Sequence, residues 1–284
     1  IGFYIVDNTE LSARKAVSKA IQTSVIAKEK GIGSVVNYHD KTVGQSLQEA
    51  NEILQSQIET AINSNQFSLF YQKVLPLNQL SQQQTSIELL LRLKSGASER
   101  LMPPNEFLNV SRKSKLNEKI DFWVVKEAVS WLQNNKLAIE KLSYISINIT
   151  AETIVNPMFL ITLENLLAEY AVAPNLLCFE ISEPDALISI NRTRIFLSRL
   201  KTLGCQTCID DFGGQSMIYQ YLDELAIDHL KVDGSFIRHL NNNPVNSVLC
   251  KMLKDMANIT GKTISCKHIE QQNVAIKLKD LGIS

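Results

Sequence analysis

The stretch LLCFEI at residues 176–181 is apolar except for Glu180, the last residue but one. A run that is apolar on both faces is typical of a strand buried in a parallel sheet. Six further runs of this kind alternate with segments of helical periodicity. They lie at residues 67–75, 86–93, 144–149, 206–211, 229–233 and 263–269. The alternation predicts an α/β fold, with parallel strands and crossover helices closed into a TIM-like (β/α) barrel.

Nearly every one of these runs ends in a polar or charged residue that a purely structural strand does not need. These residues are Glu88, Asn148, Glu180, Asp210, Asp211, Lys231, Asp233 and Lys267. Each residue taken alone is explained more simply as a cap or turn residue. The carboxyl ends of barrel strands converge on one mouth, however, so the whole set is expected to share a site.

Four carboxylates in one mouth repel one another unless cations lie between them, and oxygen ligands favour Mg²⁺ or Mn²⁺. A pair of such ions is a common device for attacking a phosphodiester with water, because the metals polarise the phosphoryl group and activate the water. The residues by themselves therefore indicate metal-assisted phosphodiester chemistry.

Bulk composition limits the other function classes. Lysine plus arginine and aspartate plus glutamate both number 29 in the 284 residues, so no overall charge attracts nucleic acid or an anionic membrane. Five scattered cysteines favour a reducing compartment, and we expect a cytoplasmic location. Cys205 and Cys208 form a CxxC pair that we interpret as buried thiols rather than as a metal or redox site. No run has the length of a membrane span, although an upstream anchor is left open.

The N-terminal region has a different organisation. Residues 1–42 contain a strand, helix and strand pattern, with the strands at 2–6 and 33–38 and the helix at 9–30. This pattern predicts the end of a domain that begins earlier in a longer protein. An amphipathic segment at 43–65 predicts a connecting helix to the barrel, which we place at residues 66–284.

Six motifs then resemble, in order, the signatures of EAL domains, the family of cyclic-di-GMP phosphodiesterases. They are FSLFYQ (67–72), ELLLR (88–92), NIT (148–150), EISE (180–183), DDFG (210–213) and KVD (231–233). The eponymous Glu-Ala-Leu is Glu88-Leu89-Leu90 here. Residues 1–42 resemble the last helix and strand of a GGDEF-type domain, and the chain ends before the last strand expected of the barrel.

The resemblance implies a domain that linearises cyclic di-GMP with two metal ions. One ion would be held by Glu88, Asn148, Glu180 and Asp210. The other ion would be held with the help of Asp210 and Asp211. Lys231 would be catalytic by steadying the attacking water, and Glu183 would brace the loop after Asp211. The nucleotide would contact Gln72, Leu90, Arg92, Asn148, Asp211 and Glu270.

One position departs from the family in a way that bears on catalysis. The motif CKHIE (266–270) places Lys267 where relatives have the glutamate that completes the second metal site. An ammonium in place of a carboxylate changes the local charge by about two units, so a second metal should bind poorly. We expect the Lys267 ammonium to take the place of a cation beside Asp210, Asp211 or Glu180. The alternative is that Lys267 extends into solvent.

These observations favour a degenerate EAL domain that does not hydrolyse its ligand and acts as a nucleotide receptor or a protein-interaction regulator, with protein partners and a homodimer both possible. One alternative is an active metal-dependent phosphodiesterase. Another is an adaptor that has lost nucleotide binding, for example a regulator of small-RNA turnover. The altered loop at 214–217 also favours loss of catalysis. We expect His229 and His268 to pack toward the helices, because we take each to lie beside the lysine of its strand, and neighbouring residues on a strand face opposite sides.

Overall fold

The computed structural model describes most of the chain. The described residues are 2–3, 17, 20–21, 23–24, 27, 36–37, 41–64, 66–77, 85–95, 100–214 and 216–283. They divide into two compact units, one of Ile1–Gln66 with Leu93–Ser114 and one of Phe67–Arg92 with Lys115–Ser284. Among the described residues, no helix is both long and apolar enough to cross a bilayer.

The first unit contains strands β1 (Gly2–Phe3) and β2 (Val36–Asn37), which pair in parallel. Both lie within the strands predicted at 2–6 and 33–38. The predicted helix at 9–30 lies largely outside the described residues, and the assignment of 1–42 to a GGDEF-type domain stays a prediction.

Helix α2 (Lys41–Ser64) covers the connecting helix predicted at 43–65. Its buried Ile58 and Ala61 are three residues apart, the spacing that places side chains on one helical face. The unit also contains strand β5 (Arg100–Met102), which pairs antiparallel with the end of β4, and helix α3 (Pro104–Lys113), which packs against α2.

The second unit is built on a curled sheet with the strand order β10-β9-β8-β7-β6-β4-β3. Every described pairing from β4 to β10 along this path is parallel. The strands are β3 (Phe67–Val74), β4 (Thr85–Ser95), β6 (Leu142–Ile149), β7 (Leu177–Ser182), β8 (Gln206–Phe212), β9 (His229–Val232) and β10 (Thr263–Cys266). All seven runs predicted from the sequence are therefore strands.

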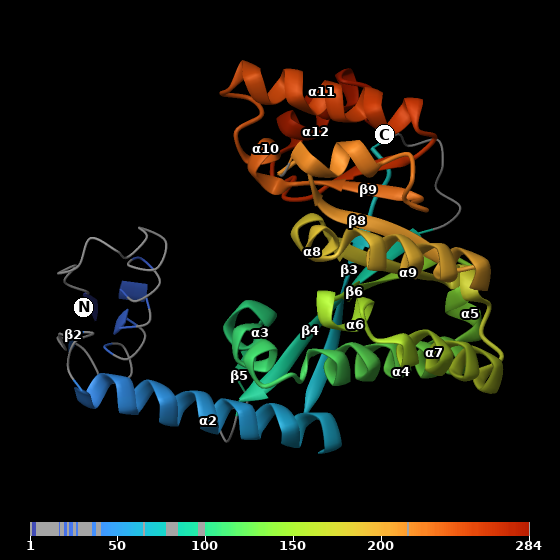
Figure 1. Ribbon diagram of the computed structural model, residues 1–284. Helices are drawn as coiled ribbons and strands as arrows, with labels where there is room; N and C mark the ends of the chain where they lie inside the picture. Colours follow the sequence, from blue (N-terminus) through green and yellow to red (C-terminus); the bar gives the residue numbers. More distant parts are fainter. Residues whose placement is uncertain are drawn as a thin grey trace. The chain divides into compact units, whose positions relative to one another are not determined.

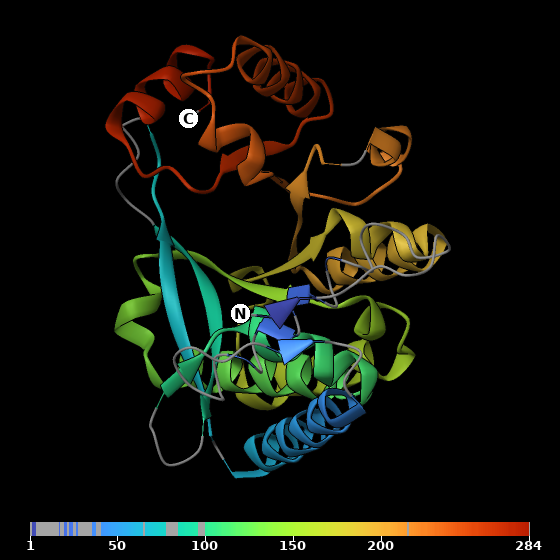
Figure 2. The ribbon, with the colours of Figure 1, turned by 90° about the vertical axis from the view of Figure 1, so that its left-hand side faces the viewer.

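Helices connect the parallel strands and cover the outer face of the sheet. They are α4 (Asn117–Asn134), α5 (Lys136–Ile139), α6 (Ala151–Ile154), α7 (Pro157–Tyr170), α8 (Glu183–Ile188), α9 (Ile190–Leu203), α10 (Gly234–Arg238), α11 (Pro244–Ile259) and α12 (Gln272–Asp280), with 3-10 turns η2 (Pro174–Leu176) and η3 (Ser216–Tyr221). Helix α4 packs beside α7, and α7 packs beside α9 (Figure 1). Figure 2 shows the same elements after a quarter turn.

The core between the sheet and the helices shows which side chains of β7 face the helices and which face the interior of the curl. Phe179 of β7 is fully buried, and its ring centroid lies 6.2 Å from that of Phe159 on α7. Phe159 in turn lies 5.9 Å from Phe196 on α9. Successive strand side chains face opposite sides, so Cys178 and Glu180 point to the interior of the curl. The fold is α/β and TIM-like, as predicted.

Candidate functional site

The carboxyl ends of β6, β7 and β8 bring several of the predicted residues to one mouth. Asn148 on β6 is in register with Glu180 on β7, and Asp210 on β8 is in register with Ser182 on β7. Glu88 on β4 joins them, because its Oε1 atom lies 3.3 Å from Nδ2 of Asn148. Strand order and register together therefore place side chains from four strands at one site, as the sequence predicted.

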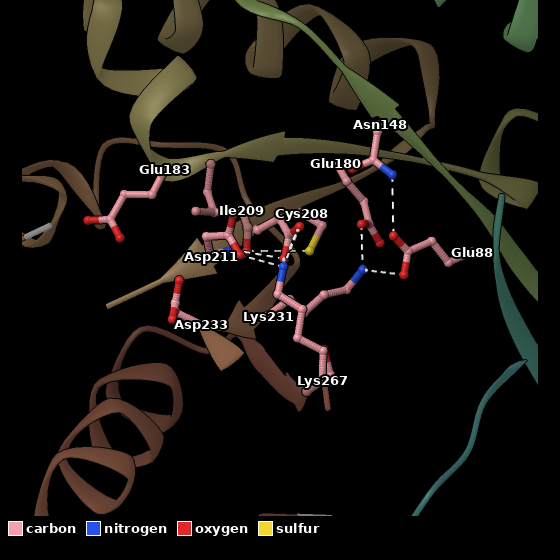
Figure 3. A network of polar contacts seen from close by, with 12 residues as sticks. Glu88, Asn148, Glu180, Glu183, Cys208, Ile209, Asp211, Lys231, Asp233 and Lys267 are labelled. Atoms are coloured by element: carbon pink, nitrogen blue, oxygen red, sulfur yellow. Dashed lines mark hydrogen bonds and ion pairs between the residues drawn. The ribbon is translucent and has the colours of Figure 1, made fainter. Parts of the chain in front are cut away.

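Lys231 lies at the centre of one half of this mouth (Figure 3). Its Nζ atom donates hydrogen bonds to Oε2 of Glu180 at 2.5 Å and to Oε2 of Glu88 at 3.0 Å. Burial alone would lower the pKa of the Lys231 ammonium, but the carboxylates of Glu180 and Glu88 outweigh burial and raise it. Lys231 is 5% exposed and Glu180 is 2% exposed, so these two charged groups are buried, whereas the Glu88 side chain is 20% exposed.

Lys267 occupies the other half of the mouth. Its Nζ atom lies 2.9 Å from both carboxylate oxygens of Asp210 and also forms an ion pair with Asp211. Burial lowers the pKa of Lys267, but Asp210 and Asp211 outweigh burial and raise it. The expected ion pair is confirmed, and the alternative in which Lys267 extends into solvent is not what the structure shows.

A local irregularity of β8 lets two adjacent acids face the same lysine. The pairing of β8 with β9 shifts its register between Ile209 and Phe212. Within that shift Asp211 has a φ of 54°, in the left-handed region that non-glycine residues rarely adopt. Its backbone N–H donates to Oδ1 of Asp210 at 2.8 Å. Adjacent strand residues otherwise face opposite sides, so this irregularity allows both carboxylates to contact Lys267.

The loop after β8 is held by a hydrogen bond to Glu183, which directly follows the neighbouring strand β7. The backbone N–H of Gly213 donates to Oε2 of Glu183 at 2.9 Å, which is the contact expected of a loop-bracing residue. Asp233 follows β9, and its Oδ1 accepts from the backbone N–H of Ser235 at 2.7 Å. Asp233 therefore caps α10, which is the simpler of the two interpretations of a strand-end acid.

The residues expected to contact a nucleotide lie farther apart than the acids and lysines of the mouth. Gln72 lines a cleft of about 1420 Å³ together with Glu88, Lys231 and Lys267. The guanidinium of Arg92 lies 5.7 Å from the ring centroid of Phe70, and its Nη1 donates to the Leu91 carbonyl at 2.7 Å. The remaining two expected contacts, Leu90 and Glu270, are half-buried and exposed, respectively.

The expectation that His229 packs toward the helices is wrong. His229 precedes Lys231 by two residues, so both side chains lie on the inner face of β9. Nε2 of His229 lies 2.7 Å from Oε1 of Gln206, and Nδ1 lies 2.6 Å from Oγ1 of Thr263. Its ring stacks on Tyr144 of β6 at 4.9 Å.

The expectations for His268 and for the cysteine pair hold. His268 packs against the start of α10, where a Cβ atom on Gly234 would lie 2.1 Å from the His268 ring. Cys205 and Cys208 are both free and buried. Burial raises the pKa of Cys205 to about 12, so its thiol is a poor nucleophile or metal ligand at neutral pH.

The family model of the EAL domain matches residues 55–284. The chain belongs to the EAL domain family. Its relatives include cyclic di-GMP phosphodiesterase PdeB of Shewanella oneidensis, 27% identical over 274 residues that cover 96% of this chain and 32% of the relative. Cyclic di-GMP phosphodiesterase PdeA of Borreliella burgdorferi is 30% identical, over 84% of this chain and 35% of the relative. The chain thus spans about a third of the length of these relatives.

Solved EAL domains share the fold. The crystal structure of the FimX EAL domain from Pseudomonas aeruginosa, bound to c-di-GMP, matches with a TM-score of 0.74 and 27% identity, over 81% of this chain and 91% of that chain. The phosphodiesterase PaMucR, in complex with c-di-GMP, matches with a TM-score of 0.75 and 24% identity, over 82% of this chain and 93% of that chain.

The acidic side chains at the mouth of this EAL domain are paired with two lysines. Glu88, Asn148, Glu180 and Asp210 offer oxygen ligands of the type that Mg²⁺ and Mn²⁺ prefer. Asp210 and Asp211, however, already share the Lys267 ammonium. Within the described part of the chain, no three histidine, cysteine or acidic side chains converge closely enough to enclose a metal ion.

Proposed function

We propose that this EAL domain does not hydrolyse cyclic di-GMP and acts in cyclic-di-GMP signalling as a nucleotide receptor or a regulator of protein partners. The observation that carries the proposal is the pair of contacts from Lys267 to Asp210 and Asp211. These two carboxylates are the ones that the family resemblance assigns to the second metal ion. An ammonium between them neutralises half of their negative charge and occupies the position of a cation, which weakens the attraction for a second divalent cation.

The chemical consequence concerns the attacking water. A divalent cation lowers the pKa of bound water by many units, which supplies hydroxide at neutral pH. An ammonium has no vacant coordination site for that water and only one positive charge. Lys231 would still lie beside the phosphodiester, but its ammonium is engaged by Glu88 and Glu180. Binding without turnover is the expected behaviour.

Nucleotide binding is supported by what the mouth retains. Gln72 lines the cleft beside Glu88, Lys231 and Lys267. The two ammonium groups provide positive charge near the carboxylates, which lowers the cost of bringing phosphates to an acidic mouth. The related FimX EAL domain, whose structure contains c-di-GMP, supports the same ligand for this chain. Protein partners, a homodimer and a cytoplasmic location are further parts of the proposal.

An active phosphodiesterase is the second candidate. It is supported by the relatives that are phosphodiesterases and by the presence here of Glu88, Asn148, Glu180 and Asp210 at one mouth. In this case Lys267 would have to move away from Asp210 and Asp211 when metal binds. The two candidates differ in whether Lys267 can be displaced by Mg²⁺ or Mn²⁺ at concentrations that sustain turnover.

One experiment separates the candidates. Calorimetric titration with cyclic di-GMP, in the presence and absence of Mg²⁺, measures binding, and chromatography of the same samples detects the linear dinucleotide. The proposal predicts binding that does not need metal and yields no linear product. Metal-dependent turnover that is abolished by Asp210→Ala would establish the active enzyme instead. Neither binding nor turnover would indicate an adaptor that has lost the nucleotide.

A further inference from the structure

Asp121 is a buried acid on α4, outside the set of residues that the family motifs assign. It is 5% exposed. A single carboxylate oxygen, Oδ2, accepts three hydrogen bonds: from the Thr150 backbone N–H at 2.8 Å, from Thr150 Oγ1 at 2.7 Å and from Thr153 Oγ1 at 2.6 Å. Burying a carboxylate is costly, and neutral donors recover only part of that cost. The contacts of Asp121 are therefore a feature that needs an explanation.

The three donors belong to the turn that ends β6. Thr150 is the residue before α6, a position where a threonine hydroxyl commonly caps the helix. Here the Thr150 side chain makes no capping bond and instead donates to Asp121. The carboxylate thus fixes both the backbone and the side chain of Thr150.

Thr150 lies two residues after Asn148, whose amide reaches Glu88 at the mouth. Ile149 between them is 3% exposed and packs in the core, so the strand end cannot rotate freely. With Ile149 packed on one side and Thr150 fixed by Asp121, the backbone direction at Asn148 is set. The orientation of Asn148 toward Glu88 therefore depends on a carboxylate that does not itself reach the mouth.

We propose that Asp121 is a positioning residue for this site, which holds the turn at Thr150 and thereby orients the Asn148 side chain toward Glu88 and toward the bound nucleotide. The part of this inference that concerns the bound nucleotide rests on the proposed function. The alternative is that Asp121 only stabilises the packing of α4 against the following segment.

The chain contains a matched control for that alternative. Glu118 lies one turn earlier on α4, and its Oε2 accepts a hydrogen bond from Asn156 Nδ2 at 2.8 Å. This bond also joins α4 to the segment after β6, but its partner is eight residues beyond Asn148. A residue that only stabilises packing should behave like Glu118.

The test compares Asp121→Asn with Glu118→Gln. In Asp121→Asn we expect the affinity for cyclic di-GMP to fall about tenfold, the usual range for residues that orient a ligating group, and the side-chain amide resonances of Asn148 to shift. Glu118→Gln should leave both unchanged. In the Asn148→Ala background, Asp121→Asn should cause no further loss of affinity, because it acts through Asn148.

Several outcomes would overturn the proposal. One is a thermal destabilisation of Asp121→Asn with unchanged affinity and unchanged Asn148 resonances. Another is that Asp121→Asn lowers the affinity for cyclic di-GMP by the same factor in the Asn148→Ala background as in the wild type. If Asp121→Asn does not fold, Thr150→Val removes one donor and should give the same shifts with a smaller loss of affinity. If the wild-type chain binds no cyclic di-GMP, the proposed function fails, while the Asn148 resonances still decide whether Asp121 positions that side chain.

Discussion

The ammonium of Lys267 is bidentate to Asp210, with Nζ 2.9 Å from each carboxylate oxygen. Charge-assisted hydrogen bonds of this length are among the stronger polar contacts in proteins. The Lys267 side chain is 28% exposed and that of Asp210 is 12% exposed, so solvent screens the pair only in part. A metal ion that binds Asp210 must therefore compete with a lysine that the fold already holds in place.

Lys267→Glu should raise the affinity for Mg²⁺ or Mn²⁺ by about tenfold or more, because it replaces a competing cation with an oxygen ligand. Without metal this variant should be less stable than the wild type, since three carboxylates then face one another. Calorimetric titration with Mn²⁺ and thermal unfolding with and without Mn²⁺ measure both effects. Lys267→Met is the control, because it removes the charge without adding an oxygen ligand. Equal metal affinity in the two variants would contradict the expectation.

Lys231→Met should reduce the free energy of unfolding by about 3 to 5 kcal/mol, because it removes the cation that pairs with the buried carboxylate of Glu180 and with the partly buried carboxylate of Glu88. Urea unfolding at pH 7 measures the loss. Lys201→Met is the control. Lys201 pairs with Asp228 at 2.6 Å, but its side chain is 40% exposed, and a pair of that type contributes about 1 kcal/mol or less. Similar losses in both variants would mean that Lys231 is not strongly coupled to Glu180 and Glu88.

The fold and much of the mouth could be predicted because their signals are local in the sequence. The segment 176–181 is an example. Its apolar residues predict a strand of a buried parallel sheet, and Glu180 near its carboxyl end predicts a residue of the site. Lys267 could be predicted to meet Asp210 because both lie at the carboxyl ends of strands in one parallel sheet. No knowledge of loop conformation was needed for these inferences.

Other features depend on information that is not local. Asp121 lies on an amphipathic helix, where an acid ordinarily faces solvent, and only the tertiary packing places Thr150 opposite it. The left-handed backbone at Asp211 follows from a shift in strand register, and the residue types at these positions do not predict that shift. The expectation for His229 is wrong for a different reason: His229 lies two residues before Lys231, and this spacing places both side chains on the inner face.

His229 should stay neutral to lower pH than an ordinary histidine, because burial lowers its pKa from 6.5. Gln206 offers an oxygen to Nε2, so the neutral ring should carry its proton on Nε2. A histidine with a lowered pKa contributes stability above pH 6.5 and loses it as the pH falls through the folded-state pKa. Ring ¹⁵N resonances report the tautomer and the pKa. A ring that protonates at or above pH 6.5 would contradict this assignment.

Asp121 should affect stability with the opposite dependence on pH. Burial outweighs its hydrogen bonds from Thr153 and Thr150 and raises its pKa to about 6, whereas an unfolded aspartate titrates near 3.9. Folding therefore favours the protonated acid, and this contribution to stability is fully present below about pH 4 and is lost as the pH rises through about 6, amounting to roughly 2 to 3 kcal/mol. The Asp121→Asn variant has no carboxyl group to titrate at this position. The difference in the free energy of unfolding between the wild type and this variant should therefore shrink by about that amount between pH 4 and pH 7. Urea unfolding of both proteins across this range measures the change, with Glu118→Gln as the control for an acid on the same helix. A deficit that is constant or grows with pH would show that the hydrogen bonds, rather than burial, dominate the ionisation of Asp121.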